Sequence, residues 1–209
     1  MKKTRCESVY AHITANRGKY IIVLISLFIG ITSGAIIGIN TNSFSDKSDF
    51  LTDFISVYKL QGITYSDVFV NSLISNLRML IVLWISGLYI WLIPVNIISV
   101  AAKGFGIGYA VAYFISGNGL KGFLFAFITM FFQNVIAIPL MLVYAVLQII
   151  FSIKVYRLKG VSSNYKQIRK LRIHNITIFF VGAIICIGCS MFEAGVTPWL
   201  IKLIYGNFA

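Results

Sequence analysis

Hydrophobic residues form long runs along this chain, and polar residues gather in a few islands between the runs. A helix that crosses a membrane needs about 20 consecutive, mostly apolar residues. The pattern therefore predicts about five membrane-spanning helices, at approximately residues 20–39, 77–98, 103–117, 123–153 and 175–195. The expected fold class is all-α, a polytopic membrane helix bundle that forms a single integral membrane domain over residues 1–209.

The first apolar run, residues 20–39, contains three glycines at intervals of four residues, Gly30, Gly34 and Gly38. Residues four apart lie on one face of a helix, and small residues on such a face let a second helix approach closely. We therefore predict a helix-packing face here. The run is longer than the apolar core of a signal peptide and no typical cleavage site follows it, so we expect it to remain as the first span.

The run from Met79 to Ser116 is too long for one span and suits two tightly joined helices. Pro94 is expected to break or kink it, and Lys103 with the neighbouring glycines predicts a turn before a short third helix. A broken or re-entrant element stays open for that third helix. The glycines in question are Gly104, Gly106 and Gly108.

The next apolar run, residues 123–153, follows a predicted turn at Gly117-Asn118-Gly119. It is longer than the bilayer requires, and Gln133, Asn134 and Pro139 interrupt it. Since a proline removes one backbone hydrogen bond, we expect a kink here, or a short half-helix before a full one.

Two polar islands and an apolar tail complete the pattern. Residues 40–76 hold all four aspartates and show helical spacing of apolar residues from Phe50. This predicts one or two helices that lie on the outer membrane surface or dock a partner. Residues 154–172 hold seven Lys or Arg and no acid, and are expected to form a cytoplasmic basic loop. The tail, residues 197–209, contains Pro198 near its start and is expected to lie at the interface.

The distribution of basic residues predicts the orientation. Cytoplasmic loops of membrane proteins carry an excess of Lys and Arg. With five spans and the N-terminus inside, thirteen of the eighteen Lys and Arg residues lie on the cytoplasmic side, and the C-terminus lies outside. The reversed topology would place most of these basic residues outside, so we dismiss it. Four spans would place residues 154–172 outside, so an odd number of spans is favoured.

Composition agrees with a membrane protein. The chain of 209 residues is 58% hydrophobic and 11% charged, whereas soluble domains are usually about 25% charged. Its net charge of +12 suggests nucleic acid, but no nucleic-acid motif is present. Contact of the basic islands with anionic membrane lipids is the better explanation, so we expect no nucleic-acid partner.

No catalytic constellation is apparent, and we predict no enzymatic activity, cofactor or metal site. His12 and His174 lack the carboxylates or thiols of a metal site, and the Cys186-x-x-Cys189 motif lies inside an apolar run, where packing is the expected role. Motifs of nucleotide-binding loops, zinc proteases and serine hydrolases are absent from the sequence.

Two charged residues within apolar runs have alternative interpretations. Glu193 either forms an ion pair or hydrogen bond inside the bundle, with Arg78 as the suggested partner, or is an interfacial acid exposed to water. Lys103 is either a lysine that extends its ammonium to the inner membrane surface, which we favour, or a functional cation.

Three local patterns together resemble the stage II sporulation protein M family. They are Lys103-Gly104-Phe105 with Gly108, Gln133-Asn134 with Ile138-Pro139, and Phe192-Glu193-Ala194 with Pro198. The span layout resembles that family over nearly the whole chain. One departure is Phe132, where the family pattern suggests a proline before the Gln-Asn pair.

The resemblance implies a non-enzymatic membrane scaffold that acts in engulfment of the forespore. It would anchor two peptidoglycan hydrolases, stage II sporulation proteins D and P, at the sporulation septum in the mother-cell membrane, for septal wall thinning and membrane migration. Lys103, Asn134 and Glu193 would hold the bundle together. The alternative is a permease-like membrane subunit of an ATP-driven transporter, and an intramembrane enzyme is the least favoured class. Homo-oligomerisation stays open.

Overall fold

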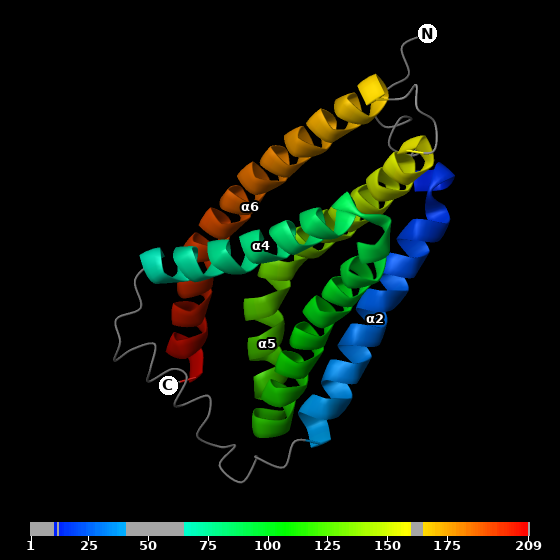
Figure 1. The fold of residues 1–209 in the computed structure, drawn as a ribbon. Coiled ribbons are helices and arrows are strands. Elements are labelled where there is room, and N and C mark those ends of the chain that lie inside the picture. The colour runs from blue at the N-terminus through cyan, green and yellow to red at the C-terminus, as the bar shows by residue number, and fades with distance from the viewer. Residues whose placement is uncertain (1–10, 12, 41–64, 160–164, 209) are drawn as a thin grey trace.

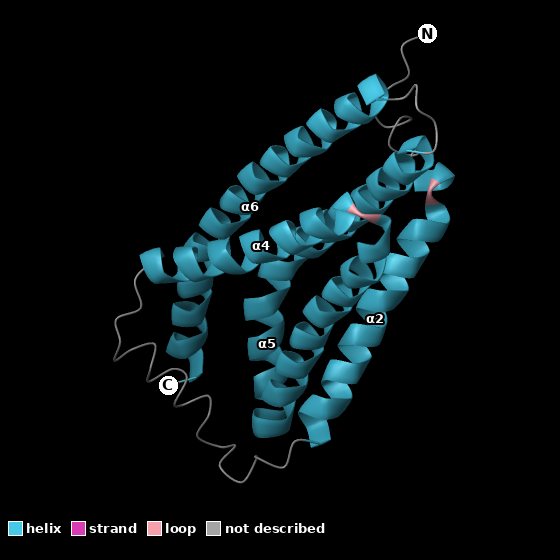
Figure 2. Cartoon of the chain, in the orientation of Figure 1, coloured by secondary structure: helices cyan, strands magenta, loops and turns pink. Residues whose placement is uncertain are grey.

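The described part of the chain is a bundle of long helices. The computed structural model describes residues 11, 13–40, 65–159 and 165–208, with the side chains of 117–118, 120–122, 124–133, 159 and 196–208 outside the description. Within these ranges the fold is helical apart from short connections (Figures 1 and 2). The elements are α2 (Arg17–Asn40), α4 (Tyr65–Leu88), the 3-10 helix η1 (Ile90–Leu92), α5 (Ile93–Lys159) and α6 (Tyr165–Phe208).

Five helical segments are long and apolar enough to cross a membrane, so the all-α fold and the predicted number of spans are confirmed. They are Arg17–Asn40, Tyr65–Leu88, Ile90–Ser116, Asn134–Leu158 and Tyr165–Gly195. Many large apolar side chains on their surfaces are exposed, among them Phe28 and Ile36 on α2 and Phe180 and Ile184 on α6. Lipid is the solvent that suits such a surface.

Helix α5 is a hairpin of two helices joined at Gly119. This residue has φ 56° and ψ −132°, a left-handed conformation that costs a glycine little. The turn predicted at Gly117-Asn118-Gly119 therefore lies where the chain reverses (Figure 1). The returning helix contains Pro139 and changes direction along its length, as the predicted kink requires.

The second and third spans begin earlier than predicted. The second is Tyr65–Leu88 instead of 77–98, and the third is Ile90–Ser116 instead of 103–117. Their junction lies at Tyr89, whose backbone is extended (φ −131°, ψ 139°) and whose carbonyl accepts a hydrogen bond from Leu92 N at 3.0 Å.

The predicted turn at Lys103 and its glycines is wrong. Lys103, Gly104, Gly106 and Gly108 all lie inside the first helix of α5, and the third span is neither short nor broken. Pro94 does not interrupt this helix because it lies in the first turn, where the missing N–H leaves no intrahelical hydrogen bond unmade.

The boundaries of both polar islands also differ from the predictions. Residues 65–76 already belong to α4, so only part of the expected outer segment 40–76 precedes the helix, and residues 41–64, with the predicted surface helix, lie outside the described residues. The expected basic loop 154–172 is mostly helical, because α5 continues to Lys159 and α6 begins at Tyr165. Basic side chains favour water, but they do not oppose helix formation.

Helix α6 continues through Pro198 to Phe208, so the backbone of the tail 197–208 is helical. The ribbon of α6 bends before its end (Figure 1). The interfacial position expected for this tail stays a prediction.

The start of α2, the α4–α5 junction, the end of α5 and the start of α6 lie at the same end of the bundle (Figure 1). We call it the basic end, because its described helix ends carry Arg17, Lys19, Lys154, Arg157, Lys159, Lys166, Arg169, Lys170 and Arg172. An inside position of this end agrees with the positive-inside rule. The orientation and the single-domain organisation stay predictions.

The glycine ridge of α2 packs directly on the first helix of α5. A Cβ atom added at Gly30, Gly34 or Gly38 would lie within 3.0 Å of atoms of α5. The contact is reciprocal, because a Cβ at Gly104 or Gly108 would meet the backbone of α2 just as closely. The two backbones thus touch, which gives the dispersion contact that holds helices together in lipid.

The apolar core lies between α2, α4, α6 and both helices of α5. Its buried side chains come from every helix: Val23, Leu27, Leu80, Leu83, Val100, Met141, Tyr144, Ala145, Val146, Ile149, Ile150 and Cys186. The returning helix of α5 contributes half of them and is therefore the central helix of the bundle.

Candidate functional site

A cluster of polar side chains joins α4 to α6. Ser72 and Asn76 are one turn apart on α4, and Ser190 and Glu193 are one turn apart on α6, so each pair shares a helix face. The Ser72 hydroxyl lies 3.3 Å from Ser190 Oγ and donates to the Glu193 carboxylate, while Asn76 Nδ2 lies 3.3 Å from Ser72 Oγ and 3.4 Å from Ser190 Oγ. We call these four residues the polar cluster.

The polar cluster gives Glu193 a hydrogen-bond partner inside the bundle. Glu193 is half-buried, and Ser72 is 5% exposed. The suggested partner Arg78 is exposed on α4, and the hydrogen bond recorded for Glu193 comes from Ser72. A carboxylate within a membrane is costly in free energy unless it is paired, so this hydrogen bond lowers the cost of placing Glu193 in the bundle.

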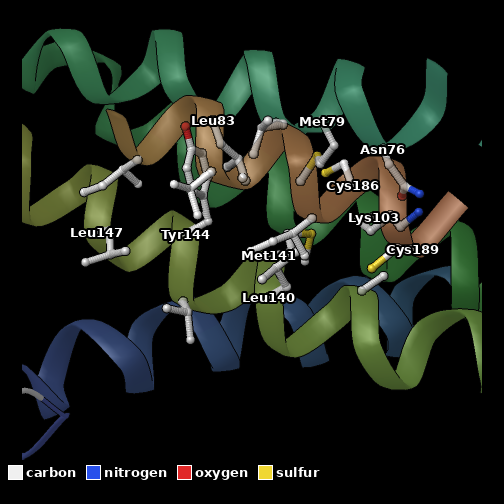
Figure 3. Close-up of a pocket in the computed structure, with 17 residues that line it drawn as sticks. Asn76, Met79, Leu83, Lys103, Leu140, Met141, Tyr144, Leu147, Cys186 and Cys189 are labelled. Atoms are coloured by element: carbon white, nitrogen blue, oxygen red, sulfur yellow. The ribbon is translucent and has the colours of Figure 1, made fainter. Parts of the chain in front are cut away.

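A pocket of about 230 Å³ lies next to the polar cluster, between α4, α5 and α6 (Figure 3). Its walls are mainly apolar and include Leu83, Met141 and Tyr144. Asn76, Lys103 and Cys189 lie at one end and Leu147 at the other. The wall also contains exposed side chains of α5 and α6, among them Val143 (44% exposed) and Val181 (51%), so the pocket opens sideways to lipid.

Lys103 lies at the middle of its span. Thirteen residues separate it from either end of Ile90–Ser116, or about 20 Å of helix. This distance is longer than a lysine side chain, and the predicted extension of the Lys103 ammonium to the membrane surface stays a prediction. The side chain is half-buried at the pocket, and no ion pair with a carboxylate is recorded for it among the described residues. A charge at this depth costs about 2.5–3.5 kcal/mol on insertion scales and marks a functional position by default.

The other predicted site residues are spread along the bundle. Asn134 is buried in α5 (9% exposed) and has a polar or ring contact, whereas Pro139 is exposed. Gln133 and Pro198 lie in helices, and their side chains are outside the description. The structure thus gathers Lys103 and Glu193 around the pocket and polar cluster, with Asn134 and Pro139 elsewhere on α5.

The two cysteines of the predicted packing pair, Cys186 and Cys189, are free thiols on the pocket wall. His174 is exposed on α6, while His12 and Cys6 lie outside the described residues. Among the described residues, no group of three His, Cys, Asp or Glu side chains is placed to hold a metal ion.

Sequence reasoning missed a second buried polar group near the basic end. Asn96 Nδ2 donates to Ser86 Oγ at 3.1 Å, and Gln148 Nε2 donates to Asn175 Oδ1 at 3.0 Å. All four side chains are at most 3% exposed. The available signal was an amide residue in each of three apolar runs, at Asn96, Gln148 and Asn175.

Comparison with known proteins gives one family. The sequence model of the family described as Stage II sporulation protein M matches residues 21–198. No curated protein matches the chain. No solved structure matches it either.

Proposed function

From the premise that this chain belongs to the stage II sporulation protein M family, we propose that it is a non-enzymatic scaffold for peptidoglycan hydrolases. Membership makes it a sporulation-related, multi-pass membrane protein. In the proposal it anchors stage II sporulation proteins D and P at the sporulation septum, in the mother-cell membrane. Their localisation would allow septal wall thinning and membrane migration during engulfment.

The observation that supports a scaffold most directly is the pocket with Lys103 at its end. A scaffold must offer partners a surface, and this pocket opens to lipid beside a mid-membrane cation that has no recorded carboxylate partner among the described residues. An acidic side chain on a partner's membrane segment would satisfy Lys103, because intramembrane charges tend to pair with one another. Residues 44–76 and the tail 197–209 are the other proposed docking surfaces.

The test is co-purification of proteins D and P with the full chain from sporulating cells. We expect both hydrolases to be retained by the wild type, and Lys103→Met to retain about tenfold less of at least one, which corresponds to 1.4 kcal/mol of binding free energy. Lys154→Met removes an exposed lysine at the basic end and is the matched control, with retention unchanged. A correctly folded wild type that retains neither hydrolase contradicts the scaffold.

The same pocket supports a second candidate, the permease-like subunit of an ATP-driven transporter. An apolar cavity that opens to lipid and ends in a cation could hold an amphiphilic anion in transit. ATP-dependent flux in vesicles that contain the chain and an ATPase would support this candidate. A deletion strain that arrests at engulfment, with the septal wall left thick, would support the scaffold instead.

A further inference from the structure

A second pocket, of about 340 Å³, lies at the basic end of the bundle. The end of α4, the residue after it, the end of α5 and the start of α6 form its walls. The lining residues are Trp84, Leu88, Tyr89, Phe151, Val155, Arg172, Asn175 and Ile176. We call it the basic-end pocket. It is separate from the pocket of Lys103, with which it shares no lining residue.

Two side chains on its walls, Arg172 and Asn175, are suited to donate to an oxyanion, and a third lining residue, Trp84, has a buried N–H. Trp84 Nε1 is buried and has no hydrogen-bond partner, and its indole ring is held against Phe179 with ring centroids 5.1 Å apart. Asn175, 3% exposed, accepts from Gln148 through Oδ1, so its amide nitrogen is left as a donor. Arg172 is exposed and adds a guanidinium, whose donors match phosphate geometry.

The charge around this pocket also favours an anion. Residues 154–172 contain seven Lys or Arg and no Asp or Glu. Lys154, Arg157 and Arg169 are exposed on the two helix ends that form part of the pocket wall. Their summed positive potential attracts anionic lipid at about 1 kcal/mol for each residue near a membrane surface.

Apart from Tyr89, the remaining wall is apolar, and this apolar surface favours a lipid over a free anion. Leu88, Phe151, Val155 and Ile176 bring hydrocarbon next to the donors. A free phosphate ion would lose hydration here without using these side chains, whereas a phospholipid places its phosphate on the donors and its glycerol and first methylenes on the apolar wall.

We propose that the basic-end pocket binds the headgroup of an anionic phospholipid, with Arg172 and Asn175 as phosphate donors. Three of the five candidate membrane spans contribute to its walls, so lipid reaches it by lateral diffusion. This site is independent of any hydrolase partner and of the Lys103 pocket. It would fix the depth of α4 and α6 in the anionic leaflet.

The test is titration of the purified full chain in neutral detergent with phosphatidylglycerol or phosphatidylcholine, with bound lipids counted by native mass spectrometry. We expect the wild type to bind one phosphatidylglycerol at least tenfold more tightly than phosphatidylcholine. Arg172→Gln is expected to weaken phosphatidylglycerol binding about tenfold, as loss of a charge-assisted hydrogen bond predicts.

The matched control is Arg169→Gln, which removes an exposed arginine that does not line the pocket, on the same helix. Equal losses in Arg169→Gln and Arg172→Gln would mean a diffuse surface potential and overturn the site. Displacement of phosphatidylglycerol by millimolar inorganic phosphate would overturn the lipid as occupant. Circular dichroism of each variant shows that it is folded, and a folded Arg172→Gln with unchanged affinity also overturns the proposal.

Discussion

Single polar side chains connect helices of this bundle that lie far apart in the sequence. Ser72 reaches Glu193 across 121 positions of the chain. In lipid such a contact has no water to compete with it, yet measured interhelical hydrogen bonds average only about 0.6 kcal/mol, with a maximum near 1.7. Ser72 donates to a carboxylate, so its contribution should lie toward the upper part of that range.

Replacement of Ser72 by alanine therefore should lower the free energy of unfolding by about 1–2 kcal/mol, because Glu193 loses a donor. Equilibrium unfolding of the full chain in mixed micelles measures this difference. Ser75→Ala, an exposed serine on the same helix, is the control and should change stability by less than about 0.5 kcal/mol. Similar effects from the two variants would show that the hydrogen bond contributes no specific stability.

Small residues decide how closely the helices approach. The α2–α5 contact depends on glycines of both helices. Along α5 only the face toward α2 is crowded: a Cβ at Gly108 would lie within 3.0 Å of the Ile31 backbone, whereas a Cβ at Gly106 would meet nothing within 4 Å. Two positions in the same helix thus predict opposite responses to one methyl group.

Gly108→Ala should destabilise the bundle by about 1–3 kcal/mol, because the helices must move apart and lose close contact along the ridge. Gly106→Ala should leave stability unchanged or raise it by up to about 1 kcal/mol, because alanine favours the helix and fits in open space. Thermal unfolding of both variants, followed by circular dichroism, makes the comparison. A loss of stability in Gly106→Ala as large as that in Gly108→Ala would contradict the packing argument.

The hydrophobic pattern predicted the number of spans but not all of their boundaries. Apolar length decides the number, and Gly119 marked a turn that the backbone adopts. The second span was misplaced because Asn71, Ser72, Asn76 and Arg78 resemble a surface segment by composition. Two of these, Ser72 and Asn76, form hydrogen bonds with Glu193 and Ser190 on α6. Hydrogen bonds between segments far apart in the chain do not show in the local hydrophobic pattern.

The glycines of α5 show a second limit of prediction from the sequence. Gly104 and Gly108 were assigned to a turn because glycine and a charge often interrupt helices. Their role depends on α2, whose own glycines predicted a packing face but not which helix it meets. The candidate site has the same limit, because Lys103 and Glu193 were identified from sequence while the pocket required the packing of three helices.

For the whole molecule, five spans and the position of the basic end predict which helix ends face the cytoplasm. Ser66 and Lys166 are both exposed and both lie in the first turn of a helix, at opposite ends of the bundle. They form a matched pair for labelling, since local structure and exposure are similar.

In a variant without the three native cysteines, Ser66→Cys should react with a membrane-impermeant maleimide in intact cells. Lys166→Cys should react only after the membrane is permeabilised, because the basic end is predicted to face inside. Gel-shift of the labelled protein gives the readout. The opposite pattern would reverse the orientation, and labelling of both in intact cells would contradict an arrangement with these two helix ends on opposite sides.

The contact between α2 and α5 has a consequence for biogenesis. Helix α2 is complete at Asn40, but the part of α5 that covers its glycines extends to Ala112, and α4 is synthesised in between. At about 5–20 residues per second, α2 waits roughly 4–14 s at the ribosome before its partner exists. We therefore expect the nascent α2 to be held by the insertion machinery until the hairpin of α5 emerges, and release of the bundle to occur late in translation.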